Sequence, residues 1–449
     1  MNRFSTNEHV DRFLTVKPEE HASWVPLRNR VLAFSLLCLT VMVSFFVSID
    51  QNQGKMSPID EWSYVDAVFQ ASQFGLVHPG EDISLEGKVY IACQDIWGVN
   101  RLGPGCDAES QPSDAWPLNG KSPAEIHPPF YFMGSAMISK AFAAAGINFD
   151  LIDGARLAGG IWLLAGFFVW LSIYRRLGAD LVSSISLLIL VALSPLVIST
   201  NTFIAPDATF AISSGLVVLA VIKVLREEIS PAWLLVAGAL PVLFKVSHLL
   251  TSIQLSALLL VLGFVTNSIT KRSALLSSLT LMAGTFLGLV SWQIARGLLR
   301  VGPSPIHPEE APEITLRNFI ANFGYHFSVL PQSSTSPIPA PWLSVQSASL
   351  FSILLLGASI GGFIYFRNKS EYFAVSVVAA SSVYAGAVVL SFITFIIAGG
   401  FLVPTARYGL PLLLLWTIPL VIAGSRTLGH WILAPLALIA VYAVNFGGY

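Results

Sequence analysis

Residues 31–49 read VLAFSLLCLTVMVSFFVSI and contain no charged side chain. As a helix, this stretch is long enough to cross the hydrocarbon core of a bilayer, which is roughly 30 Å thick. The polar residues 1–30 precede it, and no small-residue cleavage site follows it. We therefore expect an uncleaved first transmembrane helix over 31–49, preceded by a polar N-terminal tail, rather than a removable signal peptide.

Similar apolar runs recur along the chain. Charged residues make up only 11% of the sequence, and the mean hydropathy is +0.69, whereas a soluble protein carries roughly 25% charged residues. A soluble globular fold is therefore excluded, and the pattern predicts an all-α polytopic protein of about eleven transmembrane helices in a lipid bilayer. The later runs are 152–174, 181–200, 208–225, 233–248, 249–265, 274–295, 342–366, 373–398, 408–424 and 431–446.

The charge pattern predicts how the chain is oriented. If 1–30 is cytoplasmic, every short basic break falls on the cytoplasmic side, as the positive-inside rule requires of a multi-pass cell-membrane protein. Those breaks contain Arg175, Arg176, Lys223, Arg226, Lys271, Arg272, Arg367, Lys369 and Arg426. With a net charge of −1 and no long basic block, nucleic acid is not an expected partner.

The same orientation divides the chain into regions. Two large external loops, 50–151 and 296–341, flank transmembrane helices 2–7 within 152–295, and helices 8–11 follow within 342–449. Counting the apolar segment 128–145 as a span would place all the arginine pairs outside. We therefore expect an interfacial helix there, on the outer leaflet.

Two of the three cysteines lie in the first external loop. Cys93 and Cys106 have a spacing compatible with a disulfide, which would place this loop in an oxidising compartment. The alternative is two unrelated thiols. Cys38 lies in the first span, where we expect a packing role.

An acidic pair, Asp60 and Glu61, follows the first span at the outer interface. A partly desolvated carboxylate there can act as a general base on an acceptor hydroxyl, because desolvation raises its pKa. The structural alternative is a helix N-terminus with Ser57 as the cap, Pro58 at the first position and the two acids favouring the helix dipole.

Two further residues at the outer face are candidates for binding a substrate or shaping its site. His127 stands at the start of the interfacial helix, where it could contact substrate, position the acidic pair or be structural. Asp207 opens a span and could hold an acceptor, a metal or a partner arginine. Helix capping is the alternative for Asp207.

Cations near the membrane suggest phosphate binding. Lys245 lies in the predicted span 233–248. His248, three residues later on the same helical face, is a third candidate for binding the acceptor or shaping the site. Such a lysine needs a carboxylate or a lipid phosphate as partner, unless it snorkels to the interface. Arg407, followed by Tyr408, stands at the outer headgroup level and suits bidentate phosphate binding, with a headgroup anchor as the alternative.

Common catalytic motifs are absent. The sequence has no phosphate-binding loop of the Walker type, no GxSxG, no HExxH and no CxxC. The ionisable residues of 296–341 show no metal-ligand or nucleophile spacing. ATP-driven transport and serine or zinc hydrolysis are therefore poorly supported.

Together these marks resemble the GT-C superfamily of membrane glycosyltransferases, which take sugars from polyprenyl-phosphate carriers, and look most like its protein mannosyltransferase and aminoarabinose transferase branch. The resemblance covers roughly 31–424. It rests on Asp60-Glu61, His127-Pro128-Pro129-Phe130-Tyr131, Arg175-Arg176-Leu177-Gly178, Ala205-Pro206-Asp207, Lys245 and Arg407-Tyr408-Gly409-Leu410-Pro411.

The resemblance implies transfer of a sugar from a polyprenyl-phosphate donor to a glycan, lipid or protein hydroxyl, with inversion. It implies that Asp60 or Glu61 is the base, with Asp60 preferred. It places Arg407, Tyr408 and Lys245 near the donor phosphate. Some relatives use a divalent metal, for which only Asp60, Glu61 and Asp207 are obvious ligands, so the cofactor stays open. The alternatives are a polysaccharide polymerase or ligase and a non-enzymatic lipid or sugar transporter.

Overall fold

The computed structural model describes residues 27–58, 60–97, 106, 111–304, 315–322, 325, 340–365, 370–398, 405–424 and 429–446. Within these ranges seven helices are long and apolar enough to cross a membrane. The chain is therefore an all-α, multi-pass membrane protein. The seven spans lie in α2 (Leu27–Gln51), α6 (Leu151–Arg176), α9 (Phe210–Leu225), α11 (Leu249–Phe264), α12 (Lys271–Leu298), α15 (Trp342–Tyr365) and α16 (Ser370–Ala398).

The remaining predicted spans are shorter or broken. The segment 181–200 forms α7 (Leu181–Ala192) and α8 (Pro195–Thr202), which meet at 66° and make an eighth span if they count as one. Pro195 explains the break, because proline disfavours helical backbone at the residue before it. The others are α10 (Trp233–Phe244), α17 (Leu410–Trp416) with α18 (Ile418–Gly424), and α19 (Gly429–Phe446). The total of eleven spans stays a prediction.

Burial separates central helices from peripheral ones. The apolar window of α9 is 72% buried, whereas that of α2 is only 33% buried. Large apolar side chains such as Leu32 and Leu39 point outward from α2. Such a surface would be costly in water but matches the hydrocarbon of a bilayer.

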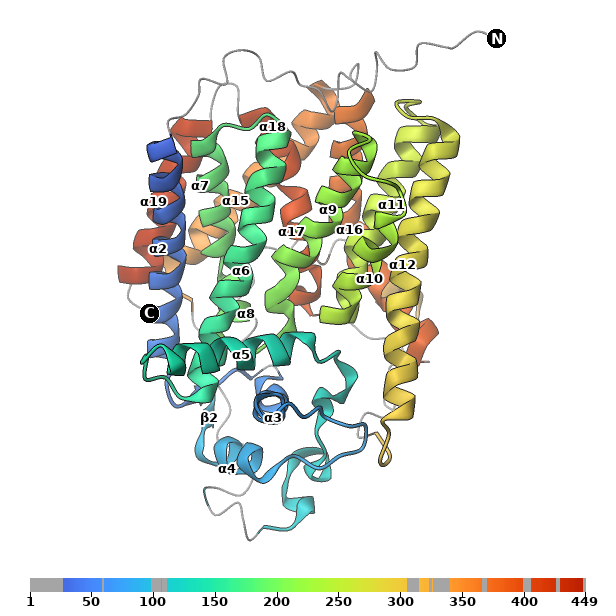
Figure 1. Ribbon diagram of the computed structural model, residues 1–449. Coiled ribbons are helices and arrows are strands. Elements are labelled where there is room, and N and C mark those ends of the chain that lie inside the picture. Colours follow the sequence, from blue (N-terminus) through green and yellow to red (C-terminus); the bar gives the residue numbers. More distant parts are fainter. Residues whose placement is uncertain are drawn as a thin grey trace.

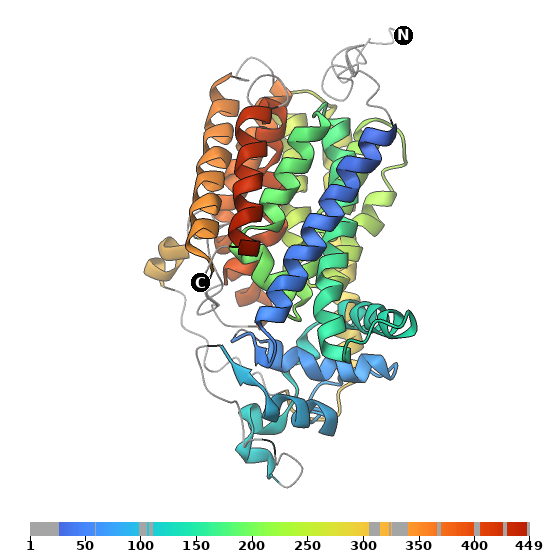
Figure 2. The ribbon, with the colours of Figure 1, turned by 90° about the vertical axis from the view of Figure 1, so that its left-hand side faces the viewer.

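The first long loop is a folded lobe, which we define as the described residues between 52 and 150. The strands β1 (Lys55–Met56) and β2 (Asp95–Ile96) pair in parallel beside α3 (Glu61–Ser72) and α4 (Leu85–Cys93). The short 3-10 helices η2 (Ser113–Ala115), η3 (Pro117–Gly120) and η4 (Pro123–Ile126) follow. A separate apolar core holds the lobe together. Figures 1 and 2 show the lobe covering one end of the bundle, which we call the lobe end.

The segment predicted to be an interfacial helix is helical, as α5 (Phe130–Ala144). It lies across the lobe end, roughly perpendicular to the bundle helices (Figure 1). Its serine face packs on the bundle: Ser139 donates to the Leu151 carbonyl, and the Trp162 indole donates to Ser135. Phe130 and Met137 on the other face are exposed. An exposed apolar face suits a helix lying at a membrane surface.

The end of α12 fastens the lobe to the bundle. Arg296 pairs with the buried Glu125 at 3.0 Å, and the Trp292 indole donates to the Ile126 carbonyl at 3.2 Å. Gly80 has a φ of +83°, and a Cβ there would lie 2.3 Å from a backbone atom of Gly302. Only glycine permits both this backbone conformation and this close approach.

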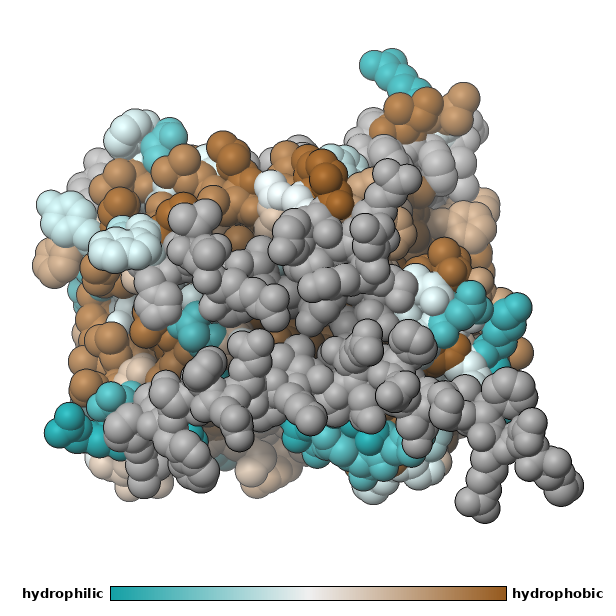
Figure 3. Space-filling model, turned by 90° about the horizontal axis from the view of Figure 1, so that it is seen from above, coloured by the Kyte–Doolittle hydropathy of each residue, from teal (hydrophilic) through white to brown (hydrophobic). Residues whose placement is uncertain are grey.

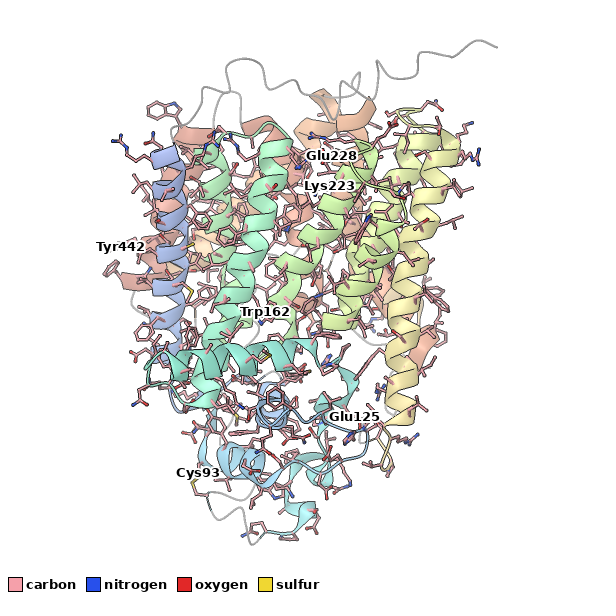
Figure 4. All side chains as sticks on the ribbon, viewed as in Figure 1. Cys93, Glu125, Trp162, Lys223, Glu228 and Tyr442 are labelled. Atoms are coloured by element: carbon pink, nitrogen blue, oxygen red, sulfur yellow. A yellow bond between two sulfur atoms is a disulfide. The ribbon has the colours of Figure 1, made fainter. Side chains whose placement is uncertain are left out.

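The two ends of the bundle differ in their charged groups. Figure 4 shows Lys223 and Glu228 at the end opposite the lobe, and Cys93 and Glu125 within the lobe. Arg176 pairs with Glu228 at 2.7 Å at that opposite end, where Figure 3 shows hydrophilic residues along the rim. Arg367, Lys369 and Arg426 lie outside the described residues.

The predicted disulfide joins Cys93 and Cys106, whose Cα atoms are 4.8 Å apart. We expect the double substitution Cys93→Ser with Cys106→Ser to lower the free energy of unfolding by about 3 kcal/mol, because an open loop leaves the unfolded chain more freedom. Thermal unfolding in detergent, with Cys38→Ser as control, measures this. Equal melting temperatures for the double variant and wild type would contradict it.

Candidate functional site

Four charged side chains form a continuous chain of ion pairs where the lobe meets the bundle. Arg407 binds Asp60 and also lies 3.5 Å from Asp207, measured from Nε to Oδ2. Lys245 binds the same Oδ2 atom of Asp207. Four of the residues singled out from the sequence therefore meet, although up to 347 positions separate them in the chain. We call these four residues the charge cluster.

Asp60 stands immediately before α3 with a left-handed backbone (φ 61°, ψ −4°). Its side chain makes no capping hydrogen bond, and α3 begins at Glu61. The alternative that Ser57 caps a helix starting at Pro58 is therefore wrong. Aspartate tolerates the left-handed region better than most residues, which lets the carboxylate turn away from the helix and reach Arg407.

The other three charges lie in short irregular segments at the lobe end. Asp207 belongs to the 3-10 helix η5 (Pro206–Thr209), and Arg407 belongs to η8 (Ala406–Gly409). Lys245 has an extended backbone between α10 and η6 (Val246–His248). Lys245 and His248 therefore do not share a helical face as expected. His248 binds Ser213 at 3.0 Å instead.

Exposure differs sharply within the charge cluster. The side chain of Asp60 is 47% exposed, whereas those of Arg407, Lys245 and Asp207 are 4%, 3% and 1% exposed. Burying ions is unfavourable unless each finds an opposite charge. In the charge cluster, two positive charges are matched by two negative ones, and of the four side chains only Asp60 is substantially exposed.

Glu61 points the other way and is fully enclosed. Its carboxylate takes a bidentate pair from Arg156 of α6, at 2.9 and 3.2 Å, and the backbone N–H groups of Ser57 and Ile204, at 2.7 and 2.9 Å. With all these donors and no exposed surface, Glu61 cannot approach an acceptor as the structure stands. Its contacts hold the segments that carry Asp60 and Asp207, so Glu61 is a positioning residue.

His127 is buried with Tyr64 beside the charge cluster. The Tyr64 hydroxyl lies 3.0 Å from Nε2 of His127. Burial, reinforced by Lys245 and Arg407, lowers the pKa of His127 well below its ordinary value. Burial also raises the pKa of Tyr64 well above its ordinary value. Both groups are therefore neutral near pH 7, and the hydrogen bond between the hydroxyl and Nε2 joins two uncharged groups.

This lowered pKa predicts a pH effect on stability. Unfolded His127 binds a proton near pH 6.5, whereas the folded protein keeps it neutral to a lower pH. The free energy of unfolding should therefore fall as the pH drops below about 6.5, by up to about 1.4 kcal/mol per pH unit from this group. Unfolding measured from pH 7.5 to 5 in wild type and His127→Gln tests this. An unchanged slope in the variant would contradict it.

Tyr408 supports the cations from one side. Its ring centroid lies 4.5 Å from Nζ of Lys245 and 5.5 Å from the guanidinium carbon of Arg407. An aromatic face attracts cations without neutralising them. Tyr408 therefore leaves the charge of both cations to be balanced by carboxylates or by an anionic ligand.

Two cavities lie near these elements. An apolar cavity of about 170 Å³ between α11 and α16 is lined by residues that include Leu250, Ile253, Val389 and Leu412. Of these lining residues, Leu250 is five positions after Lys245 in the chain, and Leu412 is five positions after Arg407. A larger cavity of about 280 Å³ beside α2, α8 and α15 includes no member of the charge cluster in its lining.

The possible metal ligands do not form one set. Among the residues that the structure describes, no three His, Cys, Asp or Glu side chains converge on a point that could hold a metal ion. Glu61 is engaged by Arg156, and Asp60 and Asp207 face cations. Asp60, Glu61 and Asp207 therefore do not fit as a shared metal site.

Sequence reasoning did not single out Arg156 or Tyr64. A signal existed for Arg156, because a charged residue within an apolar span needs a partner. Nothing in the local sequence marks Tyr64. The chain matches no model of a known protein family, and no curated protein is significantly similar to it.

Proposed function

We propose that this protein is a membrane glycosyltransferase of the GT-C type, which moves a sugar from a polyprenyl-phosphate carrier to a hydroxyl acceptor. One observation carries the proposal: two buried cations, Lys245 and Arg407, stand behind a half-exposed carboxylate, Asp60. Fixed cations at low dielectric stabilise a departing phosphate, and an accessible carboxylate can take a proton.

The reaction follows from these roles. The acceptor oxygen attacks the anomeric carbon while the bond from that carbon to the phosphate oxygen breaks. The electron pair leaves with the lipid phosphate, whose added charge Arg407 and Lys245 stabilise. The acceptor proton goes to Asp60. Attack from the side opposite the phosphate inverts the anomeric configuration.

The surroundings of the cations suit a lipid carrier. Two residues in the wall of the apolar cavity between α11 and α16 lie near the cations in the chain, since Leu250 is five positions after Lys245 and Leu412 is five positions after Arg407. A polyprenyl chain is apolar along its whole length, so its transfer from the equally apolar lipid hydrocarbon into such a cavity costs little. The phosphate would then lie at the lobe end, next to both cations.

The charge pattern supports an external active site. Lys223 and Arg176 lie at the end opposite the lobe, as the positive-inside rule predicts for a cytoplasmic end. The disulfide between Cys93 and Cys106 suits an oxidising compartment. We therefore propose that the lobe faces the outside of the cell membrane.

A donor screen tests the proposal. Protein in nanodiscs is incubated with labelled polyprenyl-phosphate sugars and a membrane-extract acceptor, beside Arg407→Gln. We expect wild type to consume at least one donor and the variant to lose at least about a hundredfold in rate, because a donor to the leaving charge is missing. Control protein carries Arg300→Gln, which removes an exposed arginine outside the cluster.

Two other outcomes favour other functions. Sugar or lipid crossing the bilayer without donor cleavage would favour a transporter. Repeated addition of the same unit to a growing glycan would favour a polymerase.

A further inference from the structure

The pairing of Arg407 with Asp60 means that the cation which would hold a donor phosphate is already occupied by the carboxylate which would act as base. We propose that Asp60 closes the phosphate site, and that a lipid phosphate opens it by taking the place of the Asp60 carboxylate on Arg407. The inference rests on the proposed function and describes how that site is regulated.

The exposure of the four side chains indicates that a phosphate takes the place of Asp60 on Arg407 rather than binding beside it. Arg407 and Lys245 are almost fully enclosed, and Asp60 is the half-exposed member of the charge cluster. Behind Arg407 lies Asp207, which is held by Lys245. A phosphate arriving from the lobe side therefore meets Asp60 before it can reach Arg407.

Charge balance leads to the same conclusion. The four side chains carry two positive and two negative charges. A phosphate added to the intact cluster would give three anions for two cations in an enclosed place, which is unfavourable. If the phosphate replaces Asp60 on Arg407, the enclosed group keeps its balance and the displaced carboxylate moves toward solvent.

The replacement links donor binding to activation of the base. While Asp60 is paired with Arg407, its carboxylate is engaged by the guanidinium. Once Arg407 holds the phosphate, the Asp60 carboxylate loses that partner and is free to take the proton of the acceptor hydroxyl. An acceptor proton can then be taken only when a donor is in place, which limits unproductive chemistry.

The backbone allows the carboxylate to move independently. Asp60 makes no capping hydrogen bond to α3, whereas Glu61 next to it is fixed by Arg156, Ser57 and Ile204. The start of α3 therefore stays in place when the Asp60 side chain changes partner. Asparagine adopts the left-handed backbone readily, so Asp60→Asn keeps this conformation.

The test measures binding of farnesyl phosphate, inorganic phosphate and farnesol to wild type, Asp60→Asn, Arg407→Gln and the control Asp114→Asn. Asp114 is an exposed acid of the lobe outside the charge cluster. Removing the competing charge should tighten farnesyl phosphate binding about tenfold in Asp60→Asn. Asp114→Asn should bind as wild type does, and farnesol binding should not change.

The inorganic phosphate arm identifies the ligand class. If Asp60→Asn binds both farnesyl phosphate and inorganic phosphate more tightly than wild type does, the effect belongs to the phosphate group. If only farnesyl phosphate binds more tightly, the lipid chain is required as well. Either result supports the replacement. Farnesyl phosphate binding that is equal or weaker in Asp60→Asn than in wild type would overturn the replacement but leave the proposed function standing. No phosphate binding to any form, or full binding to Arg407→Gln, would overturn both.

Discussion

Asp60→Asn should lower the rate of sugar transfer by about a thousandfold, within the range by which a positioned general base accelerates a reaction. Asparagine has nearly the same shape and can still accept a hydrogen bond from Arg407, but it cannot take the acceptor proton. The fold should survive, because Asp60 contributes no cap to α3. Initial rates of transfer at saturating donor measure the effect.

The control separates loss of the base from loss of a surface charge. Asp114→Asn removes an equivalent charge from an exposed position of the same lobe and should transfer sugar at the wild-type rate. Asp60→Asn with more than about a tenth of wild-type activity would mean that Asp60 is not the base, since general-base catalysis contributes at least about a hundredfold.

Glu61→Gln should lower the free energy of unfolding by about 3–5 kcal/mol, the usual cost of leaving one partner of a buried ion pair without its counter-charge. Arg156 is 1% exposed and would lose its counter-charge and one of the two oxygens to which it donates. The N–H groups of Ser57 and Ile204 would compete for the one remaining acceptor oxygen. Unfolding by denaturant in mixed micelles measures the loss.

Two comparisons make this prediction specific. Glu228→Gln breaks the half-exposed pair with Arg176 and should cost less than about 1 kcal/mol. The double variant Glu61→Leu with Arg156→Met should recover part of the stability, because neither buried charge is then left alone. A Glu61→Gln protein as stable as Glu228→Gln would show that the buried pair does not hold the lobe on the bundle.

The sequence predicted the helical membrane fold because that fold depends on composition and on the length of apolar runs. Residues 31–49 and 274–295 fall within α2 and α12, since a span needs only enough apolar residues. The sequence did not predict the break at Pro195, where one expected span becomes two helices. It also did not predict how the loop 50–151 folds, because that depends on pairings between distant segments such as β1 and β2.

The candidate site was predictable in part, because the position of a charged residue relative to an apolar run is visible in the sequence. Asp60, Asp207, Lys245 and Arg407 were each marked by a charge near the end of an apolar run. The partners of these charges follow from tertiary packing, which no local pattern contains. Asp60 and Glu61 illustrate this limit, since two adjacent acids turn in opposite directions and meet Arg407 and Arg156 respectively.

The oxygen content of the released lipid product tests the central claim most directly. Wild-type protein in nanodiscs is supplied with a donor and an acceptor in water enriched in oxygen-18. The mass of the polyprenyl phosphate formed is then measured by mass spectrometry. Glycosyl transfer breaks the bond between the anomeric carbon and oxygen, so the phosphate should contain no oxygen-18. Polyprenyl phosphate carrying one oxygen-18 atom, or no release of polyprenyl phosphate from any donor by folded protein, would contradict the assignment.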